Sequence, residues 1–119
     1  MSAHRGAIIL VDYPYSDRTG SKIRPALVIQ SDQLNQTLAD TIIALVSSSK
    51  SRFVGAPSQL VVDITTPDGL QSGLRQKSVI QCENLVTIDQ SFILRAIGRL
   101  SPAMMQQINN CLKATLGIP

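Results

Sequence analysis

The chain is 119 residues long, which is the size of one domain with a single modest core. Its composition, 44% hydrophobic and 16% charged, excludes a disordered chain, and its net charge of +3 permits a polyanionic partner without requiring one. Aromatic residues make up only 3% and Trp is absent, which argues against a protein that binds single strands by stacking bases on many rings.

The first part of the chain holds two apolar runs joined by a basic loop. Residues 6–13 are mostly apolar and predict a buried strand, and residues 25–30 predict a second strand, antiparallel to the first. The loop between them carries three cations, Arg18, Lys22 and Arg24. Pro25 has a fixed backbone angle and favours an extended conformation in the residue before it. We therefore expect a mobile basic loop whose last cation, Arg24, is held stiffly at the mouth of a buried strand.

Apolar runs further along the chain predict four more strands. They are expected at residues 41–46, 59–64, 78–83 (continued by 85–88 after a kink or bulge) and 92–100. Helical turns at residues 89–94 are the alternative for the start of the last segment. Residues 33–38 indicate one or two helical turns capped by Ser31 or Asp32, and residues 66–69 indicate a turn. A polar, basic segment at residues 47–52 is either a second flexible binding loop or a plain solvated connection.

The final segment is the strongest helix prediction in the chain. Ser101 is suited to cap the helix, Pro102 to its first position and Gly117 to its end. One apolar face is expected from residues at three- and four-residue steps, Met104, Ile108, Leu112, Thr115 and Leu116. Six short strands and one terminal helix, without alternating strand–helix units, predict a mainly β (α+β) fold: a small half-open barrel formed by a strongly bent sheet.

The residues that bind metals or form disulfides are few. Cys82 and Cys111 lie far apart without CxxC spacing, and His4 is the single histidine, so no zinc site is expected. We expect the two thiols to be small core residues in a reducing compartment. No apolar stretch approaches the length of a membrane span and the N-terminus has no signal-peptide pattern. A cytoplasmic protein with no membrane partner is therefore expected.

Three polar side chains at strand ends are candidates for chemistry, namely Arg24, Ser47 and Glu83. A guanidinium stays protonated at ordinary pH and would stabilise a charged transition state, whereas a hydroxyl can donate to a phosphate oxygen. Glu83 is the chain's single glutamate, and partial burial at the end of its strand would make it a usable base. This set fits a reaction whose nucleophile belongs to the substrate, as the 2′-hydroxyl of RNA does. The alternative for Arg24 is an ion pair with a carboxylate such as Asp12 that only secures the loop.

Several stretches carry a family resemblance: RGAIILVDYPYSDRTGSKIRPALVIQSD, then TIIALVSSS and SVIQCENLVTID, and the closing GRLSPAMMQQINNCLKATLG. Together they resemble the PemK/MazF family of ribonuclease toxins from bacterial toxin–antitoxin systems. The resemblance implies an SH3-like barrel with a terminal helix, and a homodimer that cuts single-stranded RNA, often mRNA, without a metal or other cofactor. It implies a 2′,3′-cyclic phosphate and a free 5′-hydroxyl as products. The implied protein partner is an antitoxin whose acidic, partly disordered tail competes with RNA for the basic groove.

The resemblance also assigns roles by position. Arg24 matches the arginine before proline that is central to catalysis, Ser47 the hydroxyl that holds the scissile phosphate, and Glu83 an acidic residue that acts on the 2′-hydroxyl. Ser48, one position further on, is the alternative to Ser47. Contacts with RNA are expected from a second set, Arg18, Ser21, Lys22, Ser48, Lys50, Arg52, Lys77 and Gln81.

Gln81 departs from the family pattern, because some relatives have an arginine there that shares the catalytic work. A glutamine can form hydrogen bonds but cannot neutralise charge. Two hypotheses therefore stand: an active endoribonuclease toxin that relies more heavily on Arg24, and a catalytically weak or inactive barrel that binds RNA or antitoxin. A third, an SH3-like domain that binds Pro-rich peptides, is disfavoured by the scarcity of aromatic residues.

Overall fold

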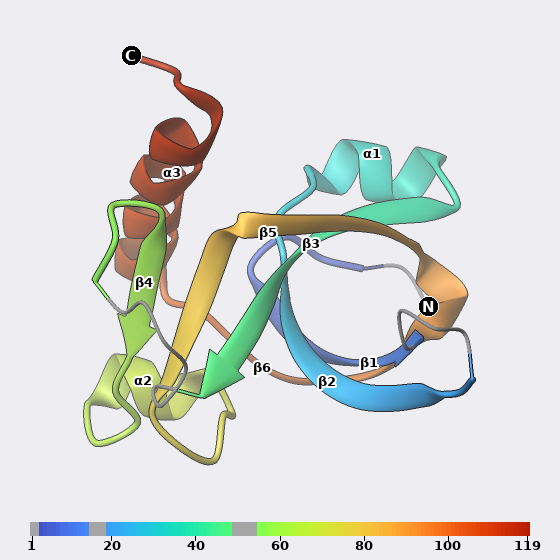
Figure 1. Cartoon of the computed structure of the whole chain (residues 1–119), viewed down its shortest axis with the longest axis horizontal. Helices are drawn as coiled ribbons and strands as arrows, with labels where there is room; N and C mark the ends of the chain where they lie inside the picture. Colours follow the sequence, from blue (N-terminus) through green and yellow to red (C-terminus); the bar gives the residue numbers. More distant parts are fainter. Residues whose placement is uncertain (1–2, 15–18, 49–54) are drawn as a thin grey trace.

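The computed structural model describes residues 3–14, 19–48 and 55–119 (Figure 1). The strands in this part of the chain are β1 (Ala7–Pro14), β2 (Ser21–Val28), β3 (Asp40–Ser48), β4 (Gln59–Val62), β5 (Ser78–Asp89) and β6 (Ile93–Arg99). The helices are α1 (Asp32–Thr37), α2 (Pro67–Gln71), the short 3-10 helix η1 (Gln90–Phe92) and α3 (Pro102–Leu116).

The strands form one antiparallel sheet in the order β4-β5-β3-β2-β1-β6. In Figure 1, β1, β2, β3 and part of β5 curve into a barrel, and β4, α2 and α3 lie to one side of it. Within the described residues, β4 and β6 are the two ends of the sheet, and no ladder joins them. The predicted mainly β fold, a half-open barrel with a C-terminal helix, is confirmed.

The bend of the sheet is concentrated in β5. Ala44 of β3 pairs with Leu85, but the next residue, Leu45, pairs with Gln81, so one step along β3 corresponds to four steps along β5. Extra residues in one strand of an antiparallel pair bend that strand and increase its twist. The first part of β5 can therefore pair with β4 while the second part follows β3 around the barrel, and the kink predicted after residue 83 is confirmed.

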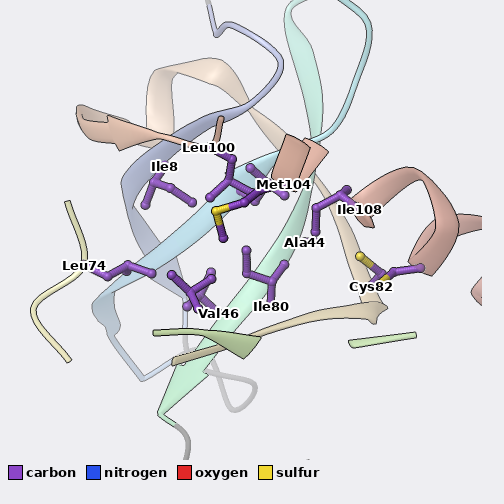
Figure 2. Packing of buried hydrophobic residues seen from close by; sticks show 12 residues of the cluster. Ile8, Ala44, Val46, Leu74, Ile80, Cys82, Leu100, Met104 and Ile108 are labelled. Carbon is purple, nitrogen blue, oxygen red and sulfur yellow. The ribbon is translucent and has the colours of Figure 1, made fainter. Parts of the chain in front are cut away.

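Side chains alternate between two faces of this sheet, and each face carries an apolar cluster. The helix face, which includes Leu27, Val46 and Ile80, packs against Met104 and Ile108 of α3 (Figure 2). The barrel face, which carries Ala26 and Leu45, surrounds a second cluster inside the barrel: Ala3, Ile9, Val11, Ala26, Val28, Ile43 and Ile88. The face on which a polar side chain lies decides which other polar side chains it can meet.

The ends of α3 are as the sequence predicts. The Ser101 hydroxyl accepts a hydrogen bond from the backbone N–H of Met104 at 3.2 Å, and Gly117 ends the helix with a φ of 69°. The buried face differs by one step from the prediction. Cys111 is buried with Met104 and Ile108, whereas Leu116 is 59% exposed.

Two local predictions were wrong. The basic loop was expected to reach Arg24, but β2 begins at Ser21, since pairing with β1 over seven positions overrides the turn signals of the sequence. Ser21, Lys22 and Arg24 therefore belong to a strand. Residues 66–69 were expected to be a turn, but Thr66 caps the short helix α2 by accepting from the N–H of Gly69 at 3.0 Å.

Candidate functional site

Arg24 and Ser47 project from the same face of the sheet. Arg24 is two residues before Ala26 in β2, so the two share a face. Ala26 pairs with Leu45, and Ser47 is two residues beyond Leu45 along β3. Both side chains therefore belong to the barrel face. The described ladder between β2 and β3 ends at Ala26 and Leu45, although both strands continue. Arg24 and Ser47 thus flank the point at which these two strands separate.

The guanidinium group of Arg24 is exposed, and within the described residues it has neither an ion pair nor a hydrogen bond. The alternative in which Asp12 neutralises it is wrong. Arg24 pairs with Val11, whereas Asp12 pairs with Ile23 and projects from the opposite face. The cation is therefore available to an anionic ligand from solvent.

The register also separates Ser47 from Ser48. Ser47 pairs with Val79 on the barrel face, and Ser48 pairs with Ser78 on the helix face. Both serines are half-buried and lie in the last two positions of β3, where a loop was expected. Of the two hydroxyls, only that of Ser47 shares a face with Arg24.

Glu83 lies on the barrel face at the β4–β5 edge, away from Arg24. Its carboxylate accepts hydrogen bonds from Ser58 Oγ at 3.0 Å and from Gln59 Nε2 at 2.6 Å. The expected partial burial of Glu83 was wrong, because its side chain is exposed. Val79 is the residue opposite Ser47, and Glu83 is four residues further along β5, about 13 Å at the usual rise of a strand. Glu83 is therefore further from Ser47 along the sheet than Gln81 is.

Gln81 lies between these two positions, half-buried on the barrel face and two residues from Val79. Its side-chain oxygen accepts a hydrogen bond from Asn84 Nδ2 at 3.1 Å. The Arg24–Ser47 face is thus extended by a neutral amide, where an arginine would have supplied a second positive charge.

The remaining predicted contact residues are spread around this face. Lys22 pairs with Tyr13 and, like Arg24, belongs to the barrel face, whereas Ser21 projects from the other face. Lys77 is exposed just before β5 and lies near Asp63. The pKa of Asp63 is lowered mainly by hydrogen bonds from Thr65, with the charge of Lys77 as the smallest contribution. Three predicted cations, Arg18, Lys50 and Arg52, lie outside the described residues.

The two thiols meet in the core under α3. Cys82 and Cys111 are both free and buried, as the sequence predicts, and their thiols form a hydrogen bond with each other. Burial raises the pKa of the Cys82 thiol to about 12, and the pKa of Cys111 is raised for the same reason. Thiols with so little thiolate at neutral pH are structural residues.

The described part of the chain has neither a candidate metal cluster nor a helix suited to a membrane. No group of three or more His, Cys, Asp or Glu residues there is placed to hold a metal ion. No helix in the same residues has both the length and the apolar character needed to cross a membrane.

Residues 4–116 match the family model described as "PemK-like, MazF-like toxin of type II toxin-antitoxin system". The chain belongs to this family. Among the curated members similar to it, "Endoribonuclease MazF9" of Mycobacterium tuberculosis is 30% identical over 118 residues, covering 96% of each chain. "Endoribonuclease EndoA" of Bacillus subtilis is 26% identical over 119 residues, covering 99% of this chain and 97% of the other.

Solved structures share the fold of this family member. A mycobacterial endoribonuclease in complex with its cognate antitoxin superposes with a TM-score of 0.79 at 20% identity, covering 99% of this chain and 98% of that one. The MazE–MazF complex from Deinococcus radiodurans (Form-II) gives a TM-score of 0.72 at 17% identity, covering 100% and 99%. At these identities the agreement concerns the PemK/MazF fold alone.

Proposed function

We propose that this PemK/MazF-family chain is a metal-independent endoribonuclease toxin that cleaves single-stranded RNA, including mRNA. The observation that carries the proposal is the exposed Arg24, which has no ion pair among the described residues, on the same face of the sheet as the hydroxyl of Ser47. Relatives of this chain are named endoribonucleases, which agrees with the chemistry that this face offers.

In the proposed reaction the 2′-oxygen of the substrate attacks the adjacent phosphorus. A bond from the 2′-oxygen to phosphorus forms and the bond from phosphorus to the 5′-oxygen breaks, which leaves a 2′,3′-cyclic phosphate and a 5′-hydroxyl. The proton of the 2′-hydroxyl passes to a base, and the leaving oxygen gains a proton from water. Arg24 stabilises the negative charge that develops on the phosphoryl oxygens, and Ser47 donates a hydrogen bond to one of them.

Glu83 remains the candidate base for the 2′-hydroxyl, at about 13 Å along β5 from the residue opposite Ser47. In a homodimer, Glu83 of either protomer could act at this phosphate. Gln81 favours a second candidate function, a barrel that binds RNA without cutting it, because a neutral residue extends the face where a second cation would help.

The proposed protein partner is an antitoxin with an acidic tail, in a cytoplasmic toxin–antitoxin pair. A protein of similar structure was solved as a complex with its cognate antitoxin. The exposed cation Arg24, which has no ion pair within the described residues, suits an acidic segment. The tail and RNA would compete, because both require Arg24.

The test uses the purified full chain with a long single-stranded RNA in EDTA. We expect cleavage by the wild type and a loss of about 100- to 1,000-fold in Arg24→Ala, the usual effect of removing a group that stabilises transition-state charge. Lys113→Ala, which removes one exposed cation from α3, is the matched control and is expected to cleave normally. RNA binding without cleavage by the wild type would favour the binding barrel and make Gln81→Arg the next variant.

A further inference from the structure

A cavity of about 580 Å³ opens on the helix face of the sheet, behind Arg24. Its walls come from β1, β2, β6, the segment between α2 and β5, and the start of β5: Leu10, Pro25, Gly73, Leu74, Arg75, Gln76, Ser78, Arg95 and Ile97. This volume lies in the usual range for pockets that hold small ligands. Among the described residues, the lining contains two arginines and no acidic residue.

Two glycines fix the wall of this cavity. A Cβ on Gly73, whose φ is +76°, would collide with the carbonyl oxygen of Ile97, and a Cβ on Gly98 would collide with the backbone of Ser72. The residues that follow α2 can therefore lie directly against β6, backbone to backbone. This contact brings Arg75 and Arg95 to the lining of one cavity although they are twenty positions apart in the sequence, which is why local sequence patterns give no sign of the pair.

The two guanidinium groups are uncommitted. Arg75 and Arg95 are exposed, and neither has a hydrogen bond or an ion pair within residues 3–14, 19–48 and 55–119. Arg5 shows the contrast: its Nε donates to the carbonyl of Ile29 at 2.9 Å and its NH2 group donates to Asn109 Oδ1 at 2.7 Å. Two like charges on one cavity repel each other, and an anion bound between them would replace that repulsion with attraction.

The cavity is close to the proposed cleavage site. Arg95 pairs with Leu10, and Leu10 pairs with Pro25, the residue after Arg24. Two strand spacings, about 10 Å, therefore separate Arg95 from the chain that carries Arg24. Pro25 and Ser78 line the cavity on the helix face near the point where β2 and β3 separate. An RNA strand that reaches both Arg24 on the barrel face and this cavity on the helix face would pass where these two strands separate.

We propose that this cavity binds a nucleotide of single-stranded RNA outside the cleavage position, with Arg75 and Arg95 on its phosphate. The inference rests on the proposed ribonuclease function and adds a second subsite to it. Arginine suits both parts of a nucleotide, because its planar fork matches phosphate oxygens and its face can stack on an unpaired base. The apolar walls formed by Leu10 and Ile97 would receive the ribose or base, and the amide of Gln76 can bond to a base edge.

The test measures binding separately from cleavage. A fluorescent RNA with 2′-O-methyl groups throughout lacks the attacking hydroxyl, so its affinity can be followed by anisotropy over a range of salt concentrations. Each phosphate contact to a single strand contributes about 0.7 to the slope of log K against log salt, so Arg75→Ala/Arg95→Ala, which removes the contact with one phosphate, should lower that slope by about 0.7. At 0.1 M salt this change in slope corresponds to an affinity about 5-fold weaker. Lys113→Ala, which removes a cation near the C-terminal end of α3, should change neither the slope nor the affinity.

The outcomes separate this inference from the proposed function. A lowered slope in the double variant supports the cavity site even where the wild type cuts no RNA. Cleavage by the wild type with an unchanged slope in the double variant overturns the cavity site and leaves the ribonuclease standing. Loss of affinity for a poly-glutamate peptide, with unchanged RNA binding, also overturns it, because the cavity would then hold an acidic protein segment. Equal melting temperatures of the wild type, the double variant and Lys113→Ala confirm that the variants fold. Titration of the wild type with inorganic phosphate, followed by the NMR signals of the arginine side chains, locates the bound anion directly.

Discussion

Two adjacent hydroxyls, those of Ser47 and Ser48, provide a sharp test of the site. They differ by one position at the end of β3, but Ser47 belongs to the barrel face with Arg24 and Ser48 to the helix face. A hydrogen bond to a charged group contributes about 1.5–3 kcal/mol. Dividing by 1.36 kcal/mol per factor of ten, we expect Ser47→Ala to slow cleavage by about 10- to 150-fold.

Ser48→Ala is the matched control for this prediction, since it removes the same atom from the same strand. We expect less than about a two-fold change in its rate, in keeping with a side chain outside the reacting face. The assay is single-turnover cleavage of a defined RNA, which reports chemistry without product release. Ser47→Thr should recover most of the rate, because it restores the hydroxyl.

Two results would refute the reasoning from register. Equal losses in both alanine variants would mean that the end of β3 acts as a unit and that the face of a side chain does not decide its role. A larger loss in Ser48→Ala would place the reacting phosphate on the helix face. Unfolding curves that match the wild type are required for either conclusion.

Three further predictions concern stability and the core. Ile108→Ala should lower the free energy of unfolding by about 2–5 kcal/mol, because this fully buried side chain joins α3 to the sheet. Leu116→Ala should change that free energy by no more than about 0.5 kcal/mol, because Leu116 is exposed. Chemical denaturation measures both variants, and equal effects would contradict the observed buried face of α3. The pKa of Cys82 rises on folding from 9.0 to about 12, so the folded state holds this proton more tightly and the free energy of unfolding should fall as pH rises above 9. A free energy of unfolding that stays constant between about pH 9 and 11, measured by denaturation, would contradict this. Gly73→Ala should lower the melting temperature more than Gly55→Ala, because both positions have positive φ but, of the two, only Gly73 lacks room for a Cβ. Equal melting temperatures would show that the backbone around Gly73 moves to accommodate the Cβ.

Much of the fold follows from local patterns in the sequence. The apolar runs predict all six strands, the break after Glu83 predicts the kink in β5, and the signals at Ser101, Pro102 and Gly117 predict α3 with its true ends. These features depend on residues that are neighbours in the chain, so local reasoning finds them. The cap at Ser31 is found in the same way, since its hydroxyl accepts from the N–H of Leu34.

The site depends on pairing between strands, which local patterns do not contain. The sequence indicates Arg24 and Ser47 as candidates, but only the register shows that they share a face and that Asp12 lies on the other. The start of β2 was misplaced because seven paired positions with β1 outweigh the local turn residues. The burial expected for Glu83 was wrong for a similar reason, since the edge of the sheet at β4 leaves it exposed.

The central claim is that RNA supplies its own nucleophile at the Arg24–Ser47 face. The most direct measurement is end-group analysis of a defined single-stranded RNA cut in EDTA, beside the same RNA with a single 2′-deoxy residue at the cleaved position. The account predicts a 2′,3′-cyclic phosphate from the all-ribose RNA, no cut at the deoxy position, and no cut by Arg24→Ala. Cleavage at the deoxy position, or products ending in a 5′-phosphate, would contradict it.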